Sequence, residues 1–210
     1  MCAAAPQHSV SKRVDTDMMA VAALERDAEL MLRVREGDSA SFSLLLERHR
    51  GPVIHFLYRM VQNQAVAEEL AQEVFFRVYR SRASYEPTAR FTTWLFRITT
   101  HLALNWIRDE RHENGNESIE DDTAKEGIAR QFSDRAPTVE QVMVRQAKLA
   151  EVRTAIESLP SKQKAAILMH KYQEMDYAQI AAILNCSESA VKSLLFRAYE
   201  TLRSRLAHMA

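Results

Sequence analysis

Apolar residues three and four positions apart recur along most of this chain, and little in it would interrupt a helix. That spacing gathers apolar side chains on one face of an α-helix. Only four of the 210 residues are Gly and five are Pro, the two residue types that most disfavour a helix interior. No stretch of useful length alternates apolar and polar residues, as a half-buried strand does. The sequence therefore predicts an all-α protein.

Two helical domains are predicted, joined by a flexible acidic linker. Residues 25–111 and 139–210 carry the helical period, whereas residues 112–138 are too polar to build a core. Residues 1–24 lack a sustained amphipathic pattern and are expected to form a mobile arm. Turn-forming residues set the expected breaks between helices, at Gly37-Asp38, Gly51-Pro52, Asn63-Gln64, the loop 84–90, Leu159-Pro160 and Asn185-Cys186.

The formal net charge of the chain is zero because segments of opposite net charge cancel. Its 28 basic residues equal its 28 acidic residues, which would argue against a nucleic-acid partner. However, residues 1–108 hold 14 basic and 12 acidic side chains, residues 109–140 hold 4 and 10, and residues 141–210 hold 10 and 6. Two mildly basic blocks joined by an acidic segment fit a protein that binds DNA weakly by itself, because affinity grows with the number of phosphates neutralised.

Several classes of protein are unsupported. The longest apolar stretches are far shorter than the roughly 20 residues of a membrane span, and no basic leader precedes an apolar core. We therefore expect a cytoplasmic protein with no membrane insertion. The two cysteines exclude a disulfide framework, and we interpret Cys186 as a packing residue rather than a redox sensor.

Neither a cofactor nor an enzymatic activity is expected. His101 and His112 lack the Glu or Cys that would complete a metal site. The sequence has too few glycines to favour a phosphate-binding glycine loop. No nucleophilic side chain stands beside a base in a recognisable arrangement.

Segment 66–80 is amphipathic, with an aromatic residue on its polar side. Its apolar face gathers Ala67, Leu70, Ala71, Val74, Phe75 and Val78. The opposite stripe contains Glu69, Gln72, Glu73, Phe76 and Arg80. An aromatic residue in an exposed charged stripe is typical of a protein docking surface. The alternative is an ordinary solvated helix whose Phe76 is covered by a neighbouring loop.

Segment 91–111 carries a polar face suited to nucleic acid. Its core stripe is expected to contain Leu95, Ile98, Leu102 and Trp106. Another face lines up Arg97, His101, Asn105 and Arg108, bordered by Trp94. Such side chains can neutralise phosphates, hydrogen-bond base edges and stack on unpaired bases. A polar helix face over a core tryptophan is the alternative.

Residues 177–206 have the spacing of a helix-turn-helix. A short helix over 177–184 is followed by a tight turn at 185–187, and Ser187 is a plausible N-cap of the next helix. Asn185 tolerates the left-handed conformation that such a turn needs. The outward face of the second helix contains Ser189, Lys192, Ser193, Phe196, Arg197 and Arg203. A plain helical hairpin is the alternative.

Taken in order, these segments resemble the extracytoplasmic-function (group 4) sigma factors of bacterial RNA polymerase. The resemblance runs from about Asp27 to Leu206. AEELAQEVFFRVYR is similar to the family's segment for gripping polymerase, FTTWLFRITTHLALNWIRDER to the segment that reads and opens the −10 element, and LPSKQKAAILMHKYQEMDYAQIAAILNCSESAVKSLLFRAYETLRSRL to the −35-reading domain. It implies a sigma-2-like bundle over 25–111 and a sigma-4-like helix-turn-helix domain over 139–210.

The resemblance also implies partners and site residues. The partners are core RNA polymerase, through the clamp helices of its largest subunit and its flap, promoter DNA, and an anti-sigma factor. Polymerase binding is implied for Glu69, Gln72, Glu73 and Phe76. Contact with the −10 strand is implied for Arg90, Thr92, Thr93, Trp94, Arg97, His101, Asn105 and Arg108. Entry into the −35 major groove is implied for Ser187, Glu188, Ser189, Lys192, Ser193 and Arg197.

The sequence departs from the family pattern at several positions. His101 stands where many members have Asn, Leu194 and Tyr199 stand where Arg is frequent, and Asn185 replaces a common Gly. These changes bear on the promoter sequence and on the strength of the −35 phosphate contacts rather than on function. In family members the linker threads toward the polymerase cleft, and we hypothesise that the acidic residues of 117–122 mimic nucleic-acid charge there.

Two other functions fit part of the sequence. A repressor or activator could use 177–206 to bind an operator, with the first block dimerising or sensing a ligand, but this leaves the Phe76 stripe and the Arg97 to Arg108 face unexplained. A helical adaptor without a DNA role predicts that replacing Arg97 or Lys192 has no effect on DNA binding. Dependence on core polymerase separates the first rival from the sigma-factor interpretation.

Overall fold

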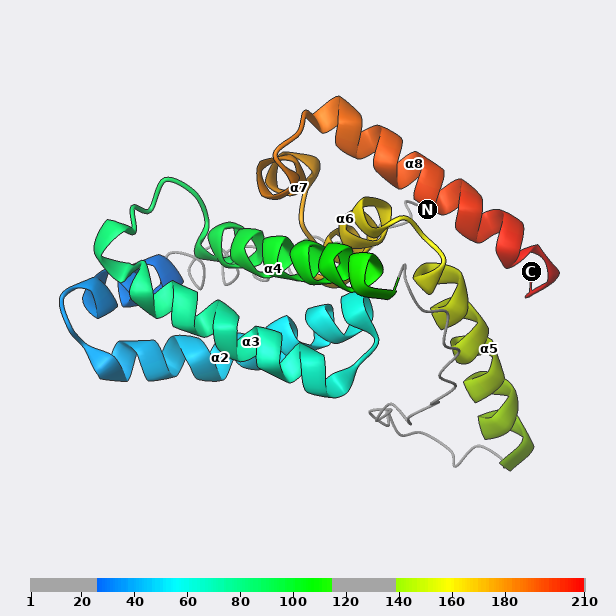
Figure 1. Ribbon diagram of the computed structural model, residues 1–210, viewed down its shortest axis with the longest axis horizontal. Helices are drawn as coiled ribbons and strands as arrows, with labels where there is room; N and C mark the ends of the chain where they lie inside the picture. Colours follow the sequence, from blue (N-terminus) through cyan, green and yellow to red (C-terminus); the bar gives the residue numbers. More distant parts are fainter. Residues whose placement is uncertain (1–25, 115–138, 210) are drawn as a thin grey trace, which may run out of the picture. The chain divides into compact units, whose positions relative to one another are not determined.

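The computed structural model describes residues 26–114 and 139–209, and every regular element in those ranges is helical (Figure 1). The N-terminal helices are a first segment over residues 26–35, α2 (Ser39–Val61), α3 (Gln64–Arg80), the 3-10 turn η1 (Arg82–Ser84) and α4 (Phe91–Asn114). The C-terminal helices are α5 (Val139–Glu157), α6 (Ser161–Tyr172), α7 (Tyr177–Leu184), α8 (Glu188–Arg205) and η2 (Ala207–Met209). The prediction of an all-α fold is confirmed.

The chain divides into two compact units, and the main division falls within α4. The expected arm, residues 1–24, lies outside the described residues, and so does most of the expected linker. Helix α4 continues through residues 112–114, which the sequence analysis assigns to the linker. Whether the domains end where the sequence predicts stays a prediction.

Helices α2 and α3 pack along each other as an antiparallel pair (Figure 1). Gly37, with φ 102°, makes the left-handed turn before α2, a conformation that glycine adopts without a steric cost. Asp38 then caps α2, since its carboxylate accepts hydrogen bonds from the amides of Ala40 and Ser41. The hydroxyl of Ser41 also donates to it, and these bonds hold the pKa of Asp38 below its usual range.

The expected break at Gly51-Pro52 is wrong, because α2 runs through both residues to Val61. Proline removes one backbone hydrogen bond and clashes with the preceding turn. Two features offset this cost. Gly51 has no Cβ to meet the proline ring, and buried side chains on both sides, including His49 and Val53, keep α2 against the core.

Aromatic contacts pack α4 against α2. The ring centroids of Phe56 and Phe96 lie 5.4 Å apart in an edge-to-face arrangement, and those of His49 and Phe91 lie 5.3 Å apart. The buried side of α4 differs from the predicted stripe. Thr99 and Thr100, which are not predicted there, are fully buried, whereas the predicted Ile98 and Trp106 are only half-buried. The hydroxyl of Thr99 donates to the Leu95 carbonyl at 2.9 Å, which satisfies it within the helix.

A buried carboxylate joins the first helical segment to α2. Asp27 is 3% exposed and its Oδ2 lies 2.9 Å from Nε2 of His49, which is itself buried. Arg48 forms an ion pair with the other carboxylate oxygen. Because an unpaired buried carboxylate is costly, these contacts fix how the segment 26–35 sits on α2.

In the C-terminal unit, α6 packs along α8 and α5 contacts α8 as well. The breaks expected at Leu159-Pro160 and Asn185-Cys186 are confirmed, since α5 ends at Glu157 and α7 at Leu184. A third break, at residues 173–176, separates α6 from α7. Burial lowers the pKa of Lys164 on α6, and the nearby Glu157 opposes that shift.

The proline inside α2 gives a first prediction. Pro52→Ala restores a backbone donor to the helix and removes the ring clash, and Pro52 is exposed, so no packing is lost. We expect the free energy of unfolding to rise by about 1–3 kcal/mol, measured by urea denaturation followed by circular dichroism.

The neighbouring glycine supplies the control for this prediction. Alone, Gly51→Ala places a Cβ against the proline ring and should not stabilise the protein. In the Pro52→Ala background it should add about 0.5–1 kcal/mol, because a Cβ at Gly51 otherwise meets nothing within 4 Å. Additive effects of the two substitutions would contradict this account.

Candidate functional site

Helix α3 presents the polar stripe that the sequence predicts. Its apolar face is buried against the core through Ala67, Ala71, Val74, Phe75 and Val78. Glu69 and Gln72 are exposed, Glu73 is half-exposed, and Phe76 is 59% exposed. Glu73 accepts a hydrogen bond from Nε of Arg77 at 2.7 Å. Among the described residues, no loop covers Phe76.

An aromatic residue that the sequence analysis missed, Tyr79, extends this surface. Tyr79 lies one helical turn beyond Phe76 and is 41% exposed. Its ring meets that of Phe42 on α2 edge to face, with centroids 5.1 Å apart, and the guanidinium of Arg82 lies 4.1 Å above it. The three-residue spacing from Phe76 could have indicated Tyr79, whereas the contact with Phe42 depends on helix packing.

Helix α4 exposes all four residues of its predicted polar face. Arg97, His101, Asn105 and Arg108 are each exposed to solvent. Arg108 forms an ion pair with Asp109 at 3.1 Å, and both partners are more than half exposed, so this pair is weak. The face therefore presents two guanidinium groups, an imidazole and an amide along one side of a rigid helix.

The start of α4 brings a correction to the predicted −10 residues. Arg90 is exposed and Thr92 is half-exposed, but Thr93 is only 6% exposed. Its position on the helix explains this, because Phe96 and Thr100, one and two turns on, are buried as well. Thr93 is a core residue that is poorly placed to contact DNA.

The loop before α4 is anchored at both ends by buried aromatic residues. Tyr85 is 2% exposed and Phe91 is fully buried, whereas all five residues between them are exposed. The Tyr85 ring packs edge to face against Trp94, with centroids 4.9 Å apart, and Trp94 in turn lies 5.8 Å from Phe91. Burial raises the pKa of Tyr85. The sequence analysis missed Tyr85, although an isolated aromatic residue in a polar loop was the available signal.

A helix-turn-helix forms where the sequence predicts it. Asn185 adopts the left-handed conformation with φ 51°, and the amide of Cys186 donates to the Ala181 carbonyl at 3.0 Å. Ser187 caps α8 by accepting from the amide of Ala190. On the inward face Val191, Leu195 and Ala198 are buried.

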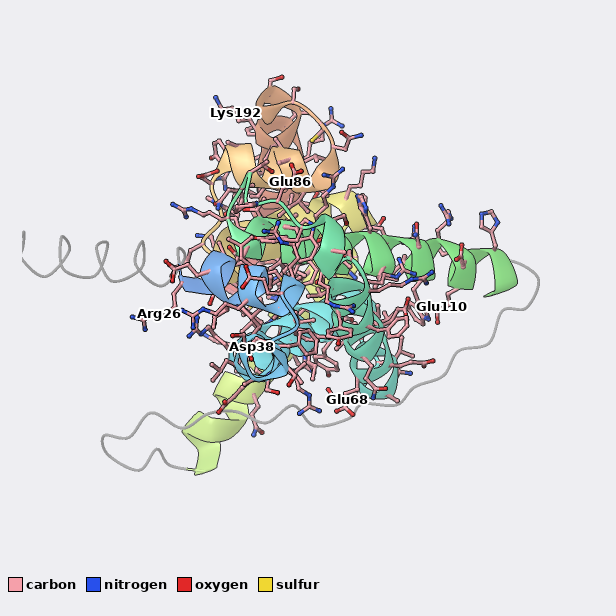
Figure 2. The ribbon with its side chains drawn as sticks, turned by 90° about the vertical axis from the view of Figure 1, so that its left-hand side faces the viewer. Arg26, Asp38, Glu68, Glu86, Glu110 and Lys192 are labelled. Carbon is pink, nitrogen blue, oxygen red and sulfur yellow. The ribbon has the colours of Figure 1, made fainter. Side chains whose placement is uncertain are left out.

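The outward face of α8 carries every residue predicted for −35 contact. Ser187, Glu188, Ser189, Lys192, Ser193 and Arg197 are all exposed. Lys192, Ser193, Phe196 and Arg197 line a shallow surface hollow, and Phe196 is 67% exposed. Lys192 projects outward near the start of the helix (Figure 2), with its ammonium 6.0 Å from the centroid of the Tyr177 ring. A solvent-facing apolar ring between two cations suits contact with a thymine methyl group beside phosphates.

Neither a metal centre nor a membrane span is found in the part of the chain that the structure describes. No three His, Cys, Asp or Glu side chains of residues 26–114 and 139–209 lie together as metal ligands would. No helix there is both long enough and apolar enough to cross a bilayer.

The fold and these surfaces define an all-helical DNA-binding protein with a C-terminal helix-turn-helix and an N-terminal bundle that has its own interaction surfaces. Residues 45–113 match the family described as Sigma-70 region 2, and residues 149–202 match Sigma-70, region 4. RNA polymerase sigma factor CarQ of Myxococcus xanthus is 32% identical over 179 residues, which cover 85% of this chain and 97% of CarQ. The ECF RNA polymerase sigma-E factor of Haemophilus influenzae is 30% identical over 181 residues, 86% of this chain and 95% of that factor. The chain belongs to the extracytoplasmic-function sigma factors of RNA polymerase.

Solved structures share the same fold. CnrH, in complex with the cytosolic domain of CnrY, has a TM-score of 0.65 at 18% identity and covers 88% of this chain and 99% of CnrH. The sigma factor RpoE of Bartonella quintana, in complex with the anti-sigma factor NepR, has a TM-score of 0.59 at 21% identity, covering 79% of this chain and 96% of RpoE. As a sigma factor, the chain binds core RNA polymerase and promoter DNA.

The turn of the helix-turn-helix gives a second prediction. A residue with a Cβ is strained at φ 51° unless its side chain compensates locally, as Asn can. We expect Asn185→Ala to destabilise α7 and α8 by about 1 kcal/mol, and Asn185→Gly to leave them as stable or more stable. Hydrogen exchange of the α7 and α8 amides measures this difference, and equal exchange in the two variants would contradict it.

Proposed function

We propose that this sigma factor binds the clamp helices of the largest polymerase subunit through the exposed stripe of α3, and the flap through its C-terminal unit. The observation that carries the first assignment is Phe76, a large ring 59% exposed among acidic and amide side chains. Exposed aromatic residues at the centre of a polar rim are typical binding hot spots. The cytoplasm, where polymerase works, is the proposed location.

Opening of the −10 element is assigned to α4 and the loop before it. Pulling a base out of the duplex costs a few kcal/mol, and stacking with edge hydrogen bonds returns about 1–3 kcal/mol per base. The exposed groups of α4, with Arg90 and Thr92 at its start, supply phosphate and base-edge contacts, and Trp94 supplies a half-exposed ring. Thr93 is left out of this set because it is buried. Strand capture of this kind needs no nucleotide hydrolysis, so we assign the protein no reaction of its own.

The start of α8 is assigned to the −35 element. Ser187, Glu188, Ser189, Lys192, Ser193 and Arg197 project from one face of this helix, as a recognition helix in the major groove requires. Two contacts hold parts of that face in place. The hydroxyls of Ser187 and Ser189 lie 2.9 Å apart, and Ser193 donates to the Ser189 carbonyl at 3.0 Å.

An inhibitory protein partner is part of the proposal. RpoE of Bartonella quintana was solved with an anti-sigma factor, and the exposed stripe of α3, with Phe76 among acidic and amide side chains, would suit such a partner as well as polymerase. If the two compete for this stripe, an anti-sigma factor that binds the chain must lower its affinity for core polymerase.

Binding to core polymerase gives a third prediction. Phe76→Ala should weaken binding by about 30-fold, the cost of losing a hot-spot residue, measured by fluorescence titration of labelled protein with core. Leu44→Ala is the matched control, because Leu44 is also half exposed and apolar but belongs to α2. Equal affinity of the Phe76→Ala and wild-type proteins would overturn the assignment of α3.

Contact with promoter DNA gives a fourth prediction. In runoff transcription with core polymerase, Arg97→Ala and Lys192→Ala should each lower the yield of transcript. Each should also reduce the slope of log affinity of the holoenzyme for promoter DNA against log salt by about 1 if it removes a phosphate contact. Arg153→Ala, which changes an exposed arginine of α5, serves as the control.

The outcomes separate the rival functions. A helical adaptor predicts no effect of either substitution on DNA binding. A repressor or activator predicts specific DNA binding by the chain without core polymerase. Transcription that requires both core and chain, and that falls in both variants, is the result expected of a sigma factor.

A further inference from the structure

We propose that Arg35 is a positioning residue for −10 recognition, which holds the loop 86–90 in place from a helix that is remote in sequence. This inference rests on the proposed role of that loop in capturing the −10 strand. The guanidinium of Arg35, at the end of the first helical segment, donates to the backbone carbonyl of Tyr85 at 3.3 Å. Fifty positions separate the two residues in the chain.

The loop itself has few attachments of its own. Its residues Glu86, Pro87, Thr88, Ala89 and Arg90 are all exposed. Within it, the amide of Thr88 donates to the Glu86 carbonyl at 2.8 Å. The conformation of such a segment is set mainly by how its two ends are fixed, because exposed loops make few stabilising contacts.

Both ends are fixed in one aromatic cluster. Tyr85 precedes the loop and Phe91 follows it, and their ring centroids lie 6.3 Å apart. Phe91 also meets His49, which is hydrogen-bonded to the buried Asp27 of the segment that carries Arg35. The same helical segment is therefore linked to both ends of the loop, directly to Tyr85 through Arg35 and indirectly to Phe91 through Asp27 and His49.

Arg35 contacts Tyr85, the loop anchor whose side chain keeps a polar group without a hydrogen-bond partner. The hydroxyl of Tyr85 is buried without a hydrogen-bond partner, so its burial is opposed by a desolvation cost. The bond from Arg35 to the Tyr85 carbonyl restrains the backbone from which the loop departs. Without it, the loop should sample more conformations, and its preference for one base over another should weaken.

The experiment compares Arg35→Ala with Arg33→Ala, an exposed arginine on the same segment. Hydrogen exchange of the free protein is measured at the loop amides. Holoenzyme is then tested on a promoter that the wild type transcribes, with its −10 positions randomised and the transcripts sequenced. We expect Arg35→Ala to raise exchange at the loop and to lower base preference at −10 by about fivefold, the effect of losing one hydrogen bond. Preference at a randomised −35 element should be unchanged.

Two further variants keep the inference falsifiable. Arg35→Lys retains a cation that can reach the carbonyl and should restore most of the −10 preference. Tyr85→Phe removes the unpartnered hydroxyl and should keep both the loop protection and the preference. Loop exchange or −10 preference in Arg35→Ala equal to that of the wild type would overturn the inference, as would the same loss in Arg33→Ala. A wild-type holoenzyme with no preference at −10 would instead overturn the proposed function of the loop.

Discussion

The N-terminal unit depends on one buried carboxylate. Asp27 is nearly inaccessible to solvent and is held by His49 and Arg48 of α2. A buried charge is tolerated only when it is paired, and removal of one partner typically costs about 3–5 kcal/mol. These two contacts therefore do more than add stability. Few other placements of the first helical segment on α2 would give the Asp27 carboxylate its partners. Through His49 it also touches Phe91, the residue at which α4 begins.

The surfaces of α3 and α4 depend on how these helices pack. Helices α3 and α4 each bury one side in the core formed with α2, and each exposes the side that carries functional groups. The stripe of α3 is acidic and aromatic, which suits a protein partner. The face of α4 is basic and polar, which suits nucleic acid. Because both lie on rigid helices, the positions of their side chains are set before either partner binds.

The even balance of 28 basic and 28 acidic residues is consistent with a subunit that binds DNA weakly by itself. A subunit that should act only with polymerase benefits from weak DNA affinity of its own, and affinity scales with the number of phosphates neutralised. Some of the exposed cations of α4 and α8 are partly offset by carboxylates, since Arg108 pairs with Asp109 and Arg203 with Glu200. The helix-turn-helix adds the shape of a recognition helix without a strongly basic surface.

The sequence by itself determined the helical class, the order of the segments, the outward stripes of α3, α4 and α8, and the turn at Asn185. All of these depend on local spacing and on intrinsic backbone preference, which neighbouring residues carry. The tertiary structure alone decided that α2 continues through Pro52, because distant packing outweighs a local helix breaker. It also decided that Thr93 is buried, that Tyr79 meets Phe42, and that Arg35 reaches Tyr85. Those contacts join residues far apart in the chain, and which face of a helix meets which neighbour is set by the packing of the whole core.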